Sequence, residues 1–165
     1  MKWILMVTFL VVLYGMTHIQ VLNMTTQEIA YTRIETAMRL ADHDATLDVT
    51  EASVAAGEPV FDQTAALATF EQSLAENLDL NPTTLQPYPN TLLTVAPKIL
   101  TVSYFDWSDV TAFPTTIVDT TDGVDMPVSA PSILAVVQFT IPSHAPGVPA
   151  ITEAVPVVES YHGEM

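Results

Sequence analysis

The sequence predicts an α+β protein in which helices come first and an antiparallel β-sheet comes last. Two observations predict this order. Apolar residues recur at helical spacing up to about residue 80, whereas short runs rich in Val, Ile, Thr and aromatic residues, separated by Pro, follow from Pro82 onward. The length of 165 residues suits one modest domain with an appendage, and an apolar content of 49% is too high for intrinsic disorder.

The first predicted element is a helix at residues 1–22 that crosses a membrane or lies in the core of a filament. No charged side chain occurs between Trp3 and Gln27. A helix of about 20 residues is about 30 Å long, which is enough to cross the apolar core of a bilayer. Lys2 precedes the apolar run, so the positive-inside rule places the N-terminus in the cytoplasm and the rest of the chain outside. The residues at its start that we expect to contact lipid or neighbouring helices are Trp3, Ile4, Leu5, Met6 and Val7.

A cleaved secretion signal is the alternative for the same segment. The strongest apolar run, Ile4 to Tyr14, has the length of a signal-peptide core. Cleavage requires small residues around the scissile bond, and Gly15-Met16-Thr17 is a poor match to that pattern. A retained helix is therefore the preferred interpretation.

Residues 23–45 are predicted to continue this helix with one apolar face. Glu35 and Arg39 are spaced as an i, i+4 ion pair in the favourable order. The apolar residues at helical spacing are Ala30, Ile34, Ala37, Met38 and Ala41.

The two helical segments could be separate or continuous. Thr25 and Glu28 fit a capping box that would start a new helix after Asn23. Neither Gly nor Pro occurs at residues 16–56, so nothing forces a break. We therefore expect one helix from about residue 3 to residue 43, whose two halves face different solvents.

Residues 46–165 form the predicted extracytoplasmic α+β domain. This region contains fifteen Asp and Glu residues and one Lys, a net charge of −14 within a chain total of −15. We expect a loop at residues 44–60 and then a helix at residues 62–80, with Asp62 as its N-cap and Asn81-Pro82 as its stop. The residues of its apolar stripe are Ala66, Leu67, Phe70, Leu74 and Leu78.

The C-terminal part of the chain is predicted to be a sheet. Pro156 lies inside the last run, which either favours a sheet edge for that strand or splits it. Tyr104, Phe105 and Trp107 are expected in the core of the sheet. The runs predicted as strands are Leu92–Val95, Ile99–Trp107, Thr115–Val118, Ser132–Ile141 and Ile151–Tyr161.

The composition argues against several classes of function. The four basic residues are Lys2, Arg33, Arg39 and Lys98, which are too few and too scattered to neutralise a phosphate backbone, so we expect no nucleic-acid binding. The absence of Cys excludes disulfides and thiolate chemistry. No sequence motif of a serine hydrolase, zinc protease, dinucleotide-binding protein or P-loop protein occurs. We therefore predict no catalytic residue and expect that the protein is not an enzyme.

Two polar clusters contain side chains of the kinds that bind metal ions. Asp119, Asp122 and Asp125 surround a Gly turn, and several carboxylates are what calcium requires. Their spacing does not match an EF-hand, and Asp-Gly is a strong hairpin signal, so a plain turn is preferred and calcium is the weaker alternative. The cluster Asp42-His43-Asp44 is expected to be a solvated helix end. Apart from that calcium alternative, no cofactor is predicted.

The layout WILMVTFLVVLYGMTHIQVLN…IETAMRLADHDATLDV, followed by a further helix and a β-rich end, resembles pilin-like proteins. The resemblance is to the type IV pilin superfamily broadly and to TadE-like minor pilins in particular, and it spans most of the chain as a pattern. Type IV pilins carry a Glu at the fifth position of the mature chain, whereas this sequence has Leu5 and no acid before Glu28.

The resemblance implies a structural subunit of a cell-surface filament. Such a subunit is held in the membrane by its N-terminal helix until it assembles with other copies, and the helices then form the filament core. The first alternative is a membrane-tethered extracytoplasmic domain that acts as an accessory or minor pilin of a secretion or surface complex. A secreted hydrolase or ligand-binding protein with a cleaved signal is a further alternative.

Overall fold

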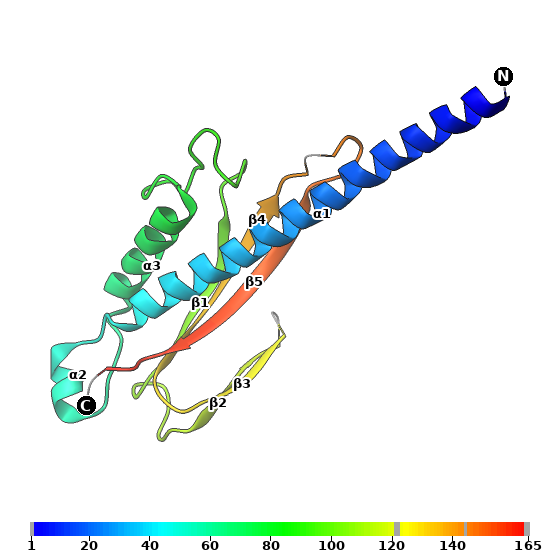
Figure 1. Cartoon of the computed structure of the whole chain (residues 1–165). Coiled ribbons are helices and arrows are strands. Elements are labelled where there is room, and N and C mark those ends of the chain that lie inside the picture. The colour runs from blue at the N-terminus through cyan, green and yellow to red at the C-terminus, as the bar shows by residue number, and fades with distance from the viewer. Residues whose placement is uncertain (1, 121–122, 144, 164–165) are drawn as a thin grey trace.

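The computed structural model describes residues 2–120, 123–143 and 145–163, and it confirms the α+β class. Within these residues, helices precede strands (Figure 1). The helices are α1 (Lys2–Thr46), α2 (Glu51–Ala56) and α3 (Gln63–Leu78). The strands are β1 (Lys98–Phe105), β2 (Thr115–Asp119), β3 (Val124–Val128), β4 (Ser132–Ile141) and β5 (Ile151–Ser160).

Helix α1 is a single unbroken helix of 45 residues, as predicted. The capping box at Thr25 does not form a break, since the Thr25 hydroxyl instead donates to the carbonyl of Val21 (3.1 Å). The predicted ion pair forms, with 2.9 Å between Arg39 and Glu35. The five residues of the predicted apolar face are all buried: Ala30, Ile34, Ala37, Met38 and Ala41. The helical periodicity therefore identified the packed face of α1 correctly.

The segment at residues 44–60 is not the continuous loop that we expected. It contains the short helix α2, which ends at Gly57 with a left-handed φ of 76°. An isolated antiparallel bridge between Val49 and Phe61 joins the two ends of this segment. Six helical residues have too short an apolar pattern to be distinguished from a loop in the sequence.

Helix α3 begins where predicted and ends earlier. The Asp62 carboxylate accepts hydrogen bonds from the amides of Thr64 (3.2 Å) and Ala65 (3.1 Å) as the N-cap. The helix stops at Asp79, whose left-handed φ of 56° turns the chain before Pro82 is reached. Within the predicted stripe, Leu67 is exposed, and the residues that are buried are Ala66, Phe70, Leu74 and Leu78.

Three strands form an antiparallel sheet in the order β1-β4-β5. The edge position predicted for the last strand is confirmed, with Pro156 opposite Val136 of the central strand. The strand predicted at Leu92–Val95 is absent among the described residues, because this stretch lies in the connection between α3 and β1. Leu93 is nevertheless buried, so its apolar character serves the core rather than a sheet.

Strand β4 is buried on both faces. One face, which includes Ile133 and Phe139, packs in the main core with α1 and α3. The other face presents Leu134 and Val136 to Ile117 of the β2–β3 ribbon. In Figure 1 the ribbon lies on the side of the sheet away from α3. A strand covered on both faces explains why the run Ser132–Ile141 is almost continuously apolar.

The predicted aromatic core residues have different roles. Tyr104 and Phe105 are half-buried and pack against the two apolar clusters, in agreement with the prediction. Trp107 lies beyond the end of β1, where its ring meets the edge of Phe113 with 5.3 Å between the ring centroids.

Asp42 is completely buried, so the expectation of a solvated helix end is wrong for this residue. Neither carboxylate oxygen has a hydrogen-bond partner of adequate geometry among the described residues. Burial, with a smaller contribution from the negative charge of Glu159, raises the pKa of Asp42 to about 9, although the Glu159 backbone amide offsets part of this rise. Burial, and then the Asp42 charge, also raises the pKa of Tyr104. The neighbouring Asp44 is instead satisfied by the Ser73 hydroxyl (2.6 Å).

The raised pKa of Asp42 makes stability depend on pH. Between its ordinary pKa of 3.8 and about 9, the folded state retains a proton that the unfolded state has released, so folding becomes less favourable as pH rises. The slope is at most about 1.4 kcal/mol per pH unit. We expect Asp42→Asn to raise the melting temperature, more at pH 8 than at pH 5. Thermal unfolding of the full chain in a non-ionic detergent, followed by circular dichroism, measures this.

The exposed Asp109 provides the matched control. Asp109→Asn makes the same Asp-to-Asn change at an exposed position of the folded domain, so it removes an acidic group without removing a buried carboxylate. Equal stabilisation by both substitutions would show that general charge repulsion, rather than burial of Asp42, causes the pH dependence.

Candidate membrane and assembly helix

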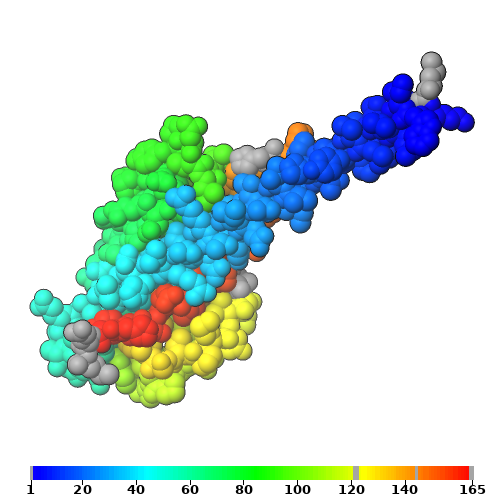
Figure 2. All heavy atoms as spheres, in the orientation of Figure 1, coloured from blue at the N-terminus to red at the C-terminus, as the bar shows by residue number. Residues whose placement is uncertain are grey.

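The N-terminal half of α1, residues 2–22, projects from the folded body as a rod (Figure 2). Every residue in this half except the half-buried Gly15 is exposed. The side chains predicted to contact lipid or other helices are between 53% and 77% exposed, and these are Trp3, Ile4, Leu5, Met6 and Val7. The structure therefore leaves the entire apolar half available for a partner or a membrane.

Apolar side chains cover this rod on all sides. Exposure of so much apolar surface to water is unfavourable, so lipid or protein must cover it. Twenty-one helical residues are about 30 Å long, which matches the apolar thickness of a bilayer. A helix of this length and composition near the N-terminus is compatible with a membrane anchor or a signal sequence.

The two Thr hydroxyls of the rod are satisfied within the helix. The hydroxyl of Thr8 donates to the carbonyl of Ile4 (2.9 Å), and that of Thr17 donates to Leu13 (2.9 Å). These hydroxyls need no hydrogen bond from water, which lowers the cost of placing them in an apolar environment. The His18 ring stacks on Tyr14, one turn earlier, with 5.9 Å between the centroids. The Thr residues are therefore compatible with placing this segment in lipid or in the core of a helix bundle.

The rod joins the folded body at a cluster of buried polar side chains. Asn23 donates to the side-chain carbonyl of Gln27 (3.2 Å), and the hydroxyl of Ser143 donates to Asn23 (3.2 Å). Asn23 and Gln27 are both buried, and the side-chain nitrogen of Gln27 has no partner among the described residues. This polar cluster marks the point where the surroundings of α1 change, although the helix itself continues.

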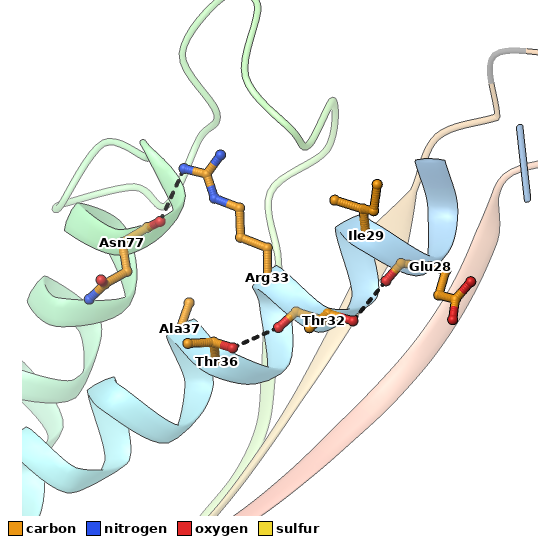
Figure 3. A pocket seen from close by; sticks show the side chains of 7 residues that line it. All are labelled: Glu28, Ile29, Thr32, Arg33, Thr36, Ala37 and Asn77. Carbon is orange, nitrogen blue, oxygen red and sulfur yellow. Dashed lines mark hydrogen bonds between the residues drawn. The ribbon is translucent and has the colours of Figure 1, made fainter. Parts of the chain in front are cut away.

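An open groove of about 560 Å³ runs beside the second half of α1 (Figure 3). Arg33 reaches across it to α3, where it donates to the carbonyl of Asn77 (3.4 Å) and to the carboxylate of Asp79 (3.0 Å). Ile29 stands in the groove and is 64% exposed. The lining residues are Glu28, Ile29, Thr32, Arg33, Thr36, Ala37 and Asn77.

This groove continues the exposed face of the rod. Ile29, Arg33, Thr36 and Leu40 follow at steps of three or four residues, so they share one side of α1. Toward the N-terminus, the same side of the helix includes Leu22 and then, at steps of three or four residues, residues 18, 15, 11, 8 and Ile4 of the rod. We call the face from Ile4 to Leu40 the assembly face. The prediction from sequence missed its second half, although the helical spacing from Ile29 is a signal that could have identified it.

The suggested calcium site is not assembled by its described members. Asp119 lies opposite Val124, and Asp125 lies opposite Val118 in the β2–β3 ribbon. Successive residues of a strand point to opposite faces, so Asp119 and Asp125 lie on opposite faces of the ribbon. Asp122 lies outside the described residues. No group of three or more His, Asp or Glu residues with metal-binding geometry occurs among the residues that the structure describes. The calcium alternative, which includes Asp122, stays a prediction.

A charge in the middle of the rod tests its contact with lipid. We expect Val12→Arg to release the full-length protein from membranes under alkaline carbonate extraction, because Arg at the centre of a bilayer costs about 3 kcal/mol. Thr25→Arg places the same charge on an exposed position beyond the rod and should leave the protein in the membrane pellet. Retention of both variants to the same extent would contradict contact of the rod with lipid.

No protein family model, curated protein or solved structure matches this chain. The layout of a long N-terminal helix and a small α+β domain is compatible with a pilin-like protein. The functional interpretation of this chain therefore depends on the geometry of α1 and of the groove beside it.

Proposed function

We propose that this chain is a non-enzymatic, pilin-like structural subunit of a cell-surface filament, assembled through the rod at residues 2–22. The observation that carries the proposal is the assembly face, a stripe that is exposed except at the half-buried Gly15 and that runs from the rod into the groove beside the folded body. A membrane alone would cover the rod, but it would leave uncovered the groove that continues along the same side of α1.

Helices of neighbouring copies can cover this face. A second helix laid along the assembly face would contact apolar side chains over the rod and would enter the groove near Ile29. When the rod of one copy enters the groove of the next copy, the two copies contribute different parts of this face, so the contact is heterologous. A heterologous contact that does not close into a ring produces a helical filament. The partners of this chain are then other copies of itself, with no nucleic acid involved.

The membrane holds the subunit before assembly. Lys2 flanks the rod, which favours a cytoplasmic N-terminus and an extracytoplasmic folded domain. The polar cluster of Asn23, Gln27 and Ser143 then lies near the membrane surface. Transfer of the rod from lipid to a bundle of rods keeps its apolar side chains away from water throughout.

A membrane-tethered domain that never polymerises is the second candidate. Its support is the match between the length of the rod and the thickness of one bilayer. This candidate requires the rod and leaves the groove beside Ile29 without a role, so the groove is the place where the two candidates differ.

A charge in the groove separates the two candidates. We expect Ile29→Arg to abolish filaments in material sheared from the cell surface, viewed by negative-stain electron microscopy, because an arginine there would oppose burial against a second helix. The membrane content and melting temperature of this variant should be unchanged, since Ile29 is 64% exposed within one subunit. Mass spectrometry of the sheared fraction identifies the chain and its N-terminus.

The matched control is Val118→Arg in β2, where the replaced side chain is 60% exposed and lies away from α1. This variant should still form filaments. Cells that produce the native chain but yield no filaments containing it would overturn the filament proposal and favour the tethered domain. Filaments of the Ile29→Arg variant would instead show that the groove plays no part in assembly.

A further inference from the structure

A cavity of about 440 Å³ lies at the end of the folded domain remote from the rod. Its size falls in the range of small-molecule sites. Three aromatic side chains line it: Trp107 and Phe113 from the connection between β1 and β2, and Tyr161 just after β5. All three are half-buried, so each ring contributes to the wall and remains accessible.

The aromatic walls are held in place by the fold. Asp106 is completely buried, and its carboxylate accepts hydrogen bonds from the amide of Phe61 (3.0 Å), the amide of Ser108 (2.8 Å) and the hydroxyl of Ser108 (2.7 Å). These bonds fix the backbone on both sides of Trp107, whose ring meets that of Phe113 edge to face. A site built from immobilised rings pays little ordering cost when a ligand binds.

The third wall is fixed separately. The amide of Tyr161 donates to the carbonyl of Pro131 (2.7 Å), and both residues line the cavity. This bond anchors the chain just beyond β5 against the segment that precedes β4.

The charge around the cavity favours a cation. None of the described residues that line it carries a formal charge, and none of the four basic residues of the chain is among them. Glu58, which is exposed, stands between two lining residues, Gly57 and Pro59. The domain at residues 46–165 has a net charge of −14. Aromatic faces are themselves electronegative, so the rings and the surrounding field both attract a positive ligand.

The same lining selects among cations. A primary ammonium would lose hydrogen bonds to water on entry, and among the described lining residues only the hydroxyls of Ser129 and Tyr161 are side-chain acceptors. A quaternary ammonium has no N–H group to satisfy and gains contact with aromatic faces. Helix α1 continues for about 36 Å beyond Leu22, the last residue of the rod, and the cavity lies toward the far end of that helix (Figure 1). Headgroups of the membrane that holds the rod therefore do not reach the cavity.

We propose that the cavity lined by Trp107, Phe113 and Tyr161 binds a small soluble quaternary ammonium compound. This binding is independent of filament assembly, since the cavity and the assembly face lie on different parts of the molecule.

Choline and its uncharged isostere 3,3-dimethyl-1-butanol provide the test in the unaltered binding site. The chain has two Trp residues, Trp3 and Trp107, so a full-length Trp3→Phe protein in maltoside detergent reports from the cavity by fluorescence. We expect saturable quenching by choline and binding of the isostere that is at least about 10-fold weaker, which corresponds to the upper range of cation–π interactions. Equal affinity for the two compounds, or no saturable change, would overturn the proposal.

Variants locate the binding. Tyr161→Leu should weaken choline binding about 10-fold, whereas Tyr161→Phe should retain most of it, because the ring is kept. Tyr88→Leu, at a half-exposed tyrosine that does not line the cavity, is the matched control and should bind as tightly as the parent protein. Melting curves identify any variant that does not fold. Undiminished binding by folded Tyr161→Leu would place the ligand elsewhere and contradict the assignment.

Discussion

The structure depends on one constraint: a single unbroken helix, α1, has two halves that require different surroundings. The half at residues 2–22 presents apolar side chains on every side, and water is a poor environment for it. The half that begins at Asn23 buries one face against α3 and the sheet. Since neither Gly nor Pro relaxes the helix between them, the folded domain is rigidly joined to whatever covers the rod. The proposed filament core and the proposed membrane anchor are two ways to satisfy the same constraint.

The folded domain is organised around α1 and β4. The Ala residues of the buried face allow close packing, and β4 provides a strand that is apolar on both sides. Asp42 interrupts this apolar packing with a buried carboxyl group that has no hydrogen-bond partner of adequate geometry among the described residues. The free-energy cost of burying Asp42 is smallest when its carboxyl group is protonated. The stability of the packing between α1 and the sheet therefore depends on pH.

Much of the fold could be predicted from sequence because the signals were local and strongly periodic. The buried face at Ile34 and Met38, the N-cap at Asp62 and the edge position of the strand with Pro156 all follow from such patterns. Burial of Asp42 could not be predicted, because an Asp near a helix end usually faces water and only the sheet that packs over it removes that water. The groove beside Ile29 also requires the end of α3, where Asn77 lies 44 residues beyond Arg33 in the chain. Likewise, the aromatic cavity requires the end of α2, the β1–β2 and β3–β4 connections and the stretch after β5 to come together.

Cysteine accessibility measures the central claim most directly, because the chain has no native Cys and each introduced thiol is unique. Single Cys variants at Leu10 in the rod and at the exposed Asp109 in the domain are treated with a membrane-impermeant maleimide on intact cells that produce the full chain. The Asp109→Cys variant should react at once, and Leu10→Cys should react only after detergent exposes the rod. Equal labelling of both on intact cells, or loss of the Leu10 position from the mature protein, would contradict a retained and covered N-terminal helix.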